Sequence, residues 1–216
     1  MEAAVIDGVG LGVEPTQKRG IAARDRLFAA AIEEFEAEGI EGSRVEKIVA
    51  AAGTSWGTFF RYFPRKEDVL LFAAADHFRR YLRPVYEAGR EDPDRSMREV
   101  ARELFAQMME PRYSPSLHAA ILDETVRYPA RFAAILDQGP LPIIMLITDL
   151  LEEGQRRGEI RGDVDALESA IVIGAGVMFS TTRVLGAVAE GHLPASEIGA
   201  VAGRAFDLVW VGLGSG

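Results

Sequence analysis

The side chains best suited to contacting another molecule are concentrated between residues 44 and 66. Hydroxyl groups at Thr54, Ser55 and Thr58 can donate and accept hydrogen bonds, and Trp56 adds a large aromatic surface. Five positively charged side chains surround them: Arg44, Lys47, Arg61, Arg65 and Lys66. Cations bind phosphates, while hydroxyl and aromatic groups reach base edges and sugars. This combination favours a nucleic-acid contact.

The charge of the chain is unevenly distributed. The 216 residues carry a formal charge of -9. Between Gln17 and Arg83, however, twelve basic residues outnumber ten acidic ones. A mildly basic front on an acidic remainder is the asymmetry expected of a polyanion-binding head.

Short helices must position these residues. An apolar stripe with helical spacing predicts a first helix over 24–38, ended by Gly39. The stripe consists of Leu27, Phe28, Ala31, Ile32 and Phe35. Ser43, with Glu46 three residues later, has the pattern of a capping box and predicts the start of a second helix.

A turn and a third helix follow. Gly53 suits a turn that needs positive φ, Ser55 predicts the N-cap of the third helix, and Pro64 ends it. Helix, glycine turn and helix form the helix-turn-helix arrangement. We expect Phe59 and Phe63 to anchor the third helix to the first. The side chains expected to project outward are Ser55, Trp56 and Thr58.

The rest of the chain also predicts helices. A long fourth helix over 68–82 is expected to break at Pro84. Further helices are predicted over 96–109, 115–127, 130–136, 143–157, 163–190 and 196–211. No segment alternates apolar and polar residues as a strand does, so the sequence predicts an all-α fold of about nine helices. Residues 1–17 are rich in glycine and predict a flexible tail.

Several other functions lack support in the sequence. The chain has no cysteine, and His118, Asp123 and Glu124 do not share one helical face as metal ligands would. No nucleophile motif appears, so we expect no catalytic residue, metal or cofactor. The longest apolar run, residues 170–179, is too short to cross a bilayer and predicts a buried helix. The expected protein is soluble and cytoplasmic.

Residues 24–72 resemble the DNA-binding head of the TetR (tetracycline-repressor-like) transcriptional regulators. The shared pattern is "I..AAG.S.GT.F.YF..KE.L", and this chain has IVAAAGTSWGTFFRYFPRKEDVL. The resemblance implies a tail over 1–17, a helix-turn-helix domain over 18–66 and a helical ligand-binding and dimerisation domain over 67–216. It also implies a homodimer that binds a palindromic operator in double-stranded DNA and responds to a small-molecule effector.

The resemblance also suggests roles for particular residues. Arg44 and Lys66 would hold phosphates, and the wider set of expected DNA contacts is Arg44, Lys47, Thr54, Ser55, Trp56, Thr58, Phe60, Tyr62 and Lys66. The family usually has tyrosine at position 60. Phe60 lacks the hydroxyl that would reach a phosphate, and Tyr62 offers one nearby.

A ligand pocket is implied in the back half. Its candidate lining residues are bulky or adaptable: Phe105, Met108, Met109, Tyr113, His118, Leu122, Phe132, Met145, Met178 and Arg183. For any single one of them, ordinary core packing is the better explanation. The resemblance places the dimer interface on the last two long helices. The alternative function is a helical ligand-binding or protein-interaction module in which the head has only a structural role. An enzymatic function is the third alternative, below these two.

Overall fold

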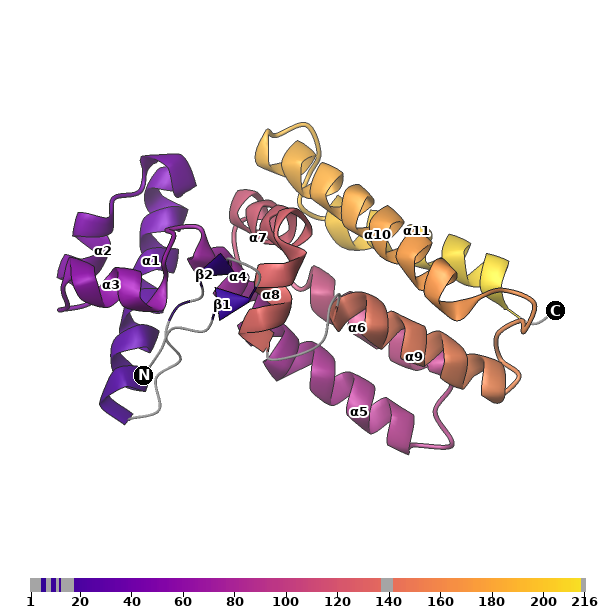
Figure 1. The fold of residues 1–216 in the computed structure, drawn as a ribbon. Coiled ribbons are helices and arrows are strands. Elements are labelled where there is room, and N and C mark those ends of the chain that lie inside the picture. Colours follow the sequence, from indigo (N-terminus) through magenta and orange to yellow (C-terminus); the bar gives the residue numbers. More distant parts are fainter. Residues whose placement is uncertain (1–4, 7–8, 11, 13–17, 137–141, 215–216) are drawn as a thin grey trace.

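The structure is a computed structural model that describes residues 5–6, 9–10, 12, 18–136 and 142–214. These residues form an all-α fold, which confirms the fold class predicted from the sequence. The helices are α1 (Lys18–Gly42), α2 (Val45–Ala51), α3 (Trp56–Tyr62), α4 (Asp68–His77), η1 (Phe78–Leu82), α5 (Arg83–Glu91), α6 (Met97–Met109), α7 (Pro115–Arg127), α8 (Pro129–Leu136), α9 (Pro142–Arg156), α10 (Ala166–Ala189) and α11 (Glu197–Leu213). In Figure 1, α1 to α3 form a head, and the later helices form a larger body beside it.

Short strands occur where the sequence predicted only a tail. β1 (Val5–Ile6) pairs antiparallel with β2 (Val9–Gly10). Most of the predicted tail lies outside the described residues. The pairing adds a ribbon of two strands with two residues each, and the rest of the architecture is helical.

The head is held together by a core that extends into the body. Phe59 and Phe63 are almost fully buried against α1, as expected from their spacing. The same cluster includes Val69 from α4 and Ile121 from α7. Helix α4 therefore belongs to both parts of the molecule, because its Leu71 packs in the core of the body.

The predicted helix break at Pro84 is wrong. The chain remains helical from α4 through the wider π-helical turn η1 into α5, where Pro84 lies in the first turn. A proline ring clashes with the carbonyl four residues earlier in a regular α-helix. The π-helical turn directly before α5 changes this register and accommodates the ring.

The prediction that residues 170–179 are buried is also wrong for the single chain. On α10, Val172 and Phe179 are 72% and 71% exposed. Ala170 is buried, and a Cβ at Gly174 would lie 2.5 Å from Ile144 Cδ1 of α9, so the small residues on this side permit close helix packing. By length and composition alone, α10 is a candidate membrane span, with few of its residues buried.

Candidate DNA-binding surface and ligand cavity

The turn between α2 and α3 has the geometry that its sequence predicts. Gly53 has φ +61°, in the left-handed region that glycine tolerates. Its N–H donates to Ala50 O, and the N–H of Thr54 donates to Val49 O, so the last carbonyls of α2 are satisfied. Arg26 of α1 donates from Nε to Ala52 O at 3.2 Å. These bonds fix the angle at which α3 leaves α2.

Helix α3 presents an exposed aromatic and hydroxyl surface. Ser55 caps the helix by accepting from the Thr58 N–H at 3.3 Å, and the two hydroxyl oxygens lie 2.9 Å apart. Trp56 and Phe60 are 47% and 37% exposed, and their ring centroids are 5.4 Å apart. Phe59 on the opposite side is fully buried. The helix is therefore anchored on one face and free on the other.

Three predicted phosphate-binding residues differ in how they are held. The Arg44 side chain is exposed at the N-cap of α2. The Lys47 ammonium lies 2.8 Å from Glu38 Oε1, and this contact raises the pKa of Lys47. Lys66 donates to the backbone carbonyls of Ile40 and Ser43, where α1 ends. Arg44 is thus the most available of the three cations.

Two sequence expectations for the head need correction. The predicted capping box at Ser43 is absent, because its hydroxyl donates back to Ile40 O at 2.7 Å and the N-cap of α2 is Arg44. The hydroxyl of Thr54 is buried without a hydrogen-bond partner among the described residues. It is therefore not presented to a groove in this conformation.

Tyr62 is half-buried, with the Arg61 guanidinium 5.9 Å from its ring centroid.

A buried polar joint connects the head to the body. The Asp68 carboxylate receives two hydrogen bonds from Arg131, at 3.1 and 2.6 Å, and one from the Arg65 N–H at 2.8 Å. Arg65 also reaches Glu124 Oε1 at 2.9 Å and lies over the Tyr128 ring. Burial raises the pKa of Glu124, against the opposing effect of the Arg65 charge. These contacts connect α7 and α8 to the start of α4.

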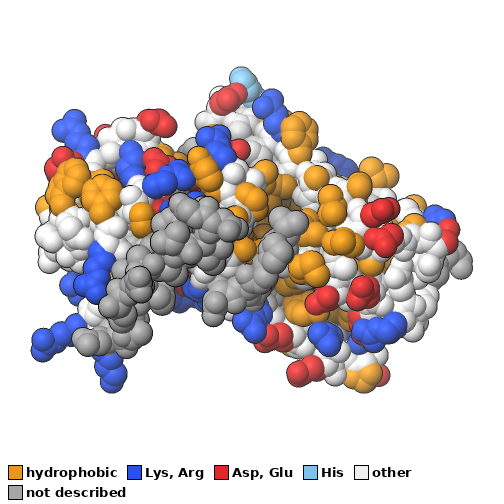
Figure 2. All heavy atoms as spheres, in the orientation of Figure 1, with side chains coloured by type: hydrophobic (Ala, Val, Ile, Leu, Met, Phe, Trp, Pro, Cys, Tyr) orange, Lys and Arg blue, Asp and Glu red, His pale blue; other side chains and the backbone are white. Residues whose placement is uncertain are grey.

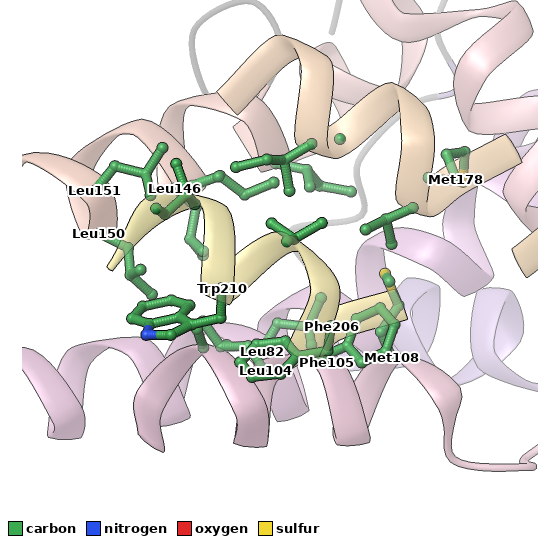
Figure 3. A pocket seen from close by; sticks show the side chains of 18 of the residues that line it. Leu82, Leu104, Phe105, Met108, Leu146, Leu150, Leu151, Met178, Phe206 and Trp210 are labelled. Atoms are coloured by element: carbon green, nitrogen blue, oxygen red, sulfur yellow. The ribbon is translucent and has the colours of Figure 1, made fainter. Parts of the chain in front are cut away.

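The body contains an apolar cavity of about 130 Å³. Figure 3 shows side chains from several helices pointing into it, including Leu82, Leu104, Phe105, Leu146 and Trp210. Nearly all of its wall is hydrocarbon or aromatic. An apolar cavity of about 150 Å³ in another protein stays dry and binds benzene, so this one suits a small ring or short alkyl group.

The predicted pocket residues do not all line one cavity. Phe105, Met108 and Met178 line the apolar cavity. Tyr113, His118, Leu122 and Phe132 line a smaller pocket of about 40 Å³ beside it, which shares Met108 with the cavity. Met109, Tyr113 and His118 line an open cleft against α11. Met145 is 45% exposed on α9, and Arg183 is exposed at the rim of a surface groove, so neither lines the cavity.

Several lining residues were not anticipated from the sequence. Phe206 and Trp210 of α11 close one side of the apolar cavity, with ring centroids 5.7 Å apart. They were assigned only to the dimer-forming helix. Their i, i+4 spacing was the available signal, since it places both rings on one face of α11.

In the part of the chain that the structure describes, no group of three or more His, Cys, Asp and Glu side chains is arranged to hold a metal ion. Two half-buried histidines, His77 and His118, line the small pocket. Burial lowers the pKa of His118 and lowers that of His77 to about 4, with the nearby Arg112 charge adding to the effect on His77.

Comparison with known proteins agrees with this architecture. Residues 27–73 match the model of the family described as bacterial regulatory proteins, tetR family. A similar solved structure is the TetR-family repressor FadR from Thermus thermophilus in complex with lauroyl-CoA, which is 26% identical, with 86% of this chain and 92% of that chain covered and a TM-score of 0.65. A TetR-family regulator from Mesorhizobium loti is 19% identical, with 92% and 100% coverage and a TM-score of 0.64. No curated protein matches the chain.

Proposed function

Because this chain carries the head of the tetR family of bacterial regulatory proteins on the matching all-α fold, we propose that it is a ligand-responsive repressor. It acts without enzymatic activity in the cytoplasm, as a homodimer on a palindromic operator. A small, mostly apolar molecule releases it from the DNA. The apolar cavity in the body supports this ligand class, and the Thermus thermophilus FadR structure contains an acyl-CoA.

The exposed face of α3 is the observation that carries the DNA-binding proposal. Trp56, Phe60 and the Ser55 hydroxyl are held outward by a buried anchor, Phe59. A helix presented in this way fits a major groove. In Figure 2, Lys and Arg side chains lie around the hydrophobic side chains of the head, where phosphates would flank them.

Titration onto the DNA upstream of its own gene, followed by fluorescence anisotropy, tests this function. We expect tight binding to one fragment and weaker binding to scrambled DNA, with a steep loss of affinity as salt rises. Arg44→Ala should weaken binding to both DNAs and lower the salt slope by about 1, whereas Trp56→Ala should reduce preference for the operator. Arg83→Ala, on the body, is the matched control. Salt-independent binding, or no binding to either DNA at low salt, would support the interaction-module alternative instead.

We further propose that the dimer forms through α10 and α11. Their exposed apolar side chains include Val172 and Phe179 on α10 and Leu208 and Val211 on α11, each more than two-thirds exposed. Figure 2 shows hydrophobic side chains gathered over the α10 side of the body. A contiguous apolar patch of this kind marks a protein–protein interface more often than a monomer surface.

A charge on this face should separate the protomers. We expect the wild-type protein to have twice the 23.5 kDa mass of one chain by light scattering. Phe179→Glu should shift it to the monomer, since the carboxylate would lose water inside an apolar interface. Ile21→Glu, a similarly drastic change at an exposed site on α1, should leave the dimer intact. A Phe179→Glu dimer of unchanged stability would exclude this interface.

The cavity and the buried polar joint suggest how a ligand bound in the body would change the position of the head. Phe132 of α8 lines the small pocket beside the cavity, and Arg131, its neighbour in sequence, binds Asp68 at the start of α4. A ligand that displaces α8 would shift the Asp68 contact and rotate α4. The size of the response is limited by the difference in ligand affinity between the two states.

A further inference from the structure

The small pocket next to the apolar cavity has a polar side. The two spaces share four lining residues: Phe78, Leu82, Met108 and Ile143. The cavity is almost entirely apolar, whereas the pocket of about 40 Å³ adds His77, Arg112 and His118. This volume accommodates a water molecule or a small polar group. Met108 lies between the two spaces, and an unbranched thioether side chain can move to join them.

One nitrogen in this pocket has an unmet hydrogen-bonding requirement. His77 Nε2 is buried and has no hydrogen-bond partner among the described residues. In a neutral imidazole one ring nitrogen donates a hydrogen bond and the other accepts one, and a hydroxyl group can pair with Nε2 in either role. Nε2 therefore requires a hydrogen-bonding partner.

Neutral His77 follows from its surroundings. Burial lowers its pKa to about 4, and the charge of Arg112 acts in the same direction. Asp76 opposes these effects from the same helix, and His118 faces it from α7. At pH 7 the ring is consequently neutral, so it offers a carboxylate no opposite charge.

Arg112 does not provide an open anion site. Its guanidinium stacks on Tyr81, with Cζ 3.8 Å from the ring centroid, and Nη2 donates to the Gln107 side-chain oxygen at 3.1 Å. Nη1 also lies 3.5 Å from the Gln107 carbonyl oxygen. These contacts hold the cation against its own loop. The group in the pocket that lacks a hydrogen-bond partner is therefore His77 Nε2, and not the Arg112 guanidinium.

We propose that the effector is an amphipathic molecule whose apolar body fills the cavity and whose hydroxyl group forms a hydrogen bond with His77 Nε2. This ligand class rests on the proposed function and makes it more specific. A hydrocarbon of the same shape leaves Nε2 unpaired, and an anionic head group loses its hydration beside a ring without charge. Selectivity between these classes comes from one buried nitrogen, since leaving it without a hydrogen-bond partner is costly.

Three matched probes test the proposal by calorimetry on the full chain in the absence of DNA: 3-phenylpropan-1-ol, propylbenzene and 3-phenylpropanoate. The variants are His77→Phe, which removes the ring nitrogens, and His77→Gln, whose side-chain amide can replace Nε2 as a hydrogen-bonding group. We expect the affinity ratio of alcohol to hydrocarbon to fall about tenfold in His77→Phe, as for loss of one buried hydrogen bond. His77→Gln should recover most of that ratio. Circular dichroism of each variant verifies its fold.

Other outcomes overturn the proposal. An alcohol-to-hydrocarbon ratio unchanged in His77→Phe would assign Nε2 to an ordered water only. The carboxylate probe could instead bind more tightly than the alcohol, and Arg112→Met could weaken that binding. The site would then select anionic ligands. Absence of binding by all three probes would exclude a ligand of this size. Operator binding is measured separately: alcohol bound through His77 without operator release would contradict the proposed function while leaving the subsite intact.

Discussion

Phe59→Ala should lower the free energy of unfolding by about 3–5 kcal/mol and abolish operator binding. The Phe59 side chain is fully buried between α1 and α3, and its ring meets those of Phe60 and Phe63 at centroid distances of 5.2 and 5.5 Å. Its removal creates a cavity in the small core that orients α3. Urea denaturation followed by circular dichroism measures the loss of stability, and anisotropy measures DNA binding.

The neighbouring phenylalanine is the matched control. Phe60 is 37% exposed beside Phe59 on the same helix, so Phe60→Ala should cost less than about 1 kcal/mol of stability. Any effect of Phe60→Ala on DNA binding then reports contact and not folding. Equal destabilisation by the two substitutions would contradict the anchored-helix description of α3.

Asp68→Ala should lower the free energy of unfolding by a comparable amount, about 3–5 kcal/mol at pH 7. The Asp68 carboxylate is 5% exposed, binds Arg131 through two hydrogen bonds and accepts from the Arg65 N–H. Its loss leaves the Arg131 guanidinium, 12% exposed, without its anion. Urea denaturation of the purified variant measures the change.

An exposed aspartate provides the comparison. Asp123 pairs with Arg127 at 2.9 Å on the surface of α7, with both side chains more than half exposed. Asp123→Ala should change stability by less than about 0.5 kcal/mol, because solvent screens such pairs. If Asp68→Ala were equally mild, the joint between head and body would not depend on this buried pair. The route from cavity to head through α8 would then lose its support.

The local features of the head were predictable because they depend on neighbours in the sequence. The apolar stripe of α1, the positive φ of Gly53 and the Ser55 cap all operate within one or two helical turns. The family motif adds spacing constraints on the same short stretch. The exposure of Trp56 and the burial of Phe59 follow from helical geometry alone, and both predictions are confirmed.

Contacts between distant segments decided what the sequence analysis missed. Lys66 turns toward the carbonyls of α1 because Ile40, 26 residues earlier, lies beside it in space. Pro84 is tolerated because the packing of the body stabilises a π-helical turn before it. The unpaired nitrogen of His77 lies in a pocket lined by residues of α6, α7, α8 and α9, which are distant from it in the sequence. Local sequence thus determined most of the helices and the exposed residues of α3, whereas burial by remote elements determined which polar groups have a hydrogen-bond partner.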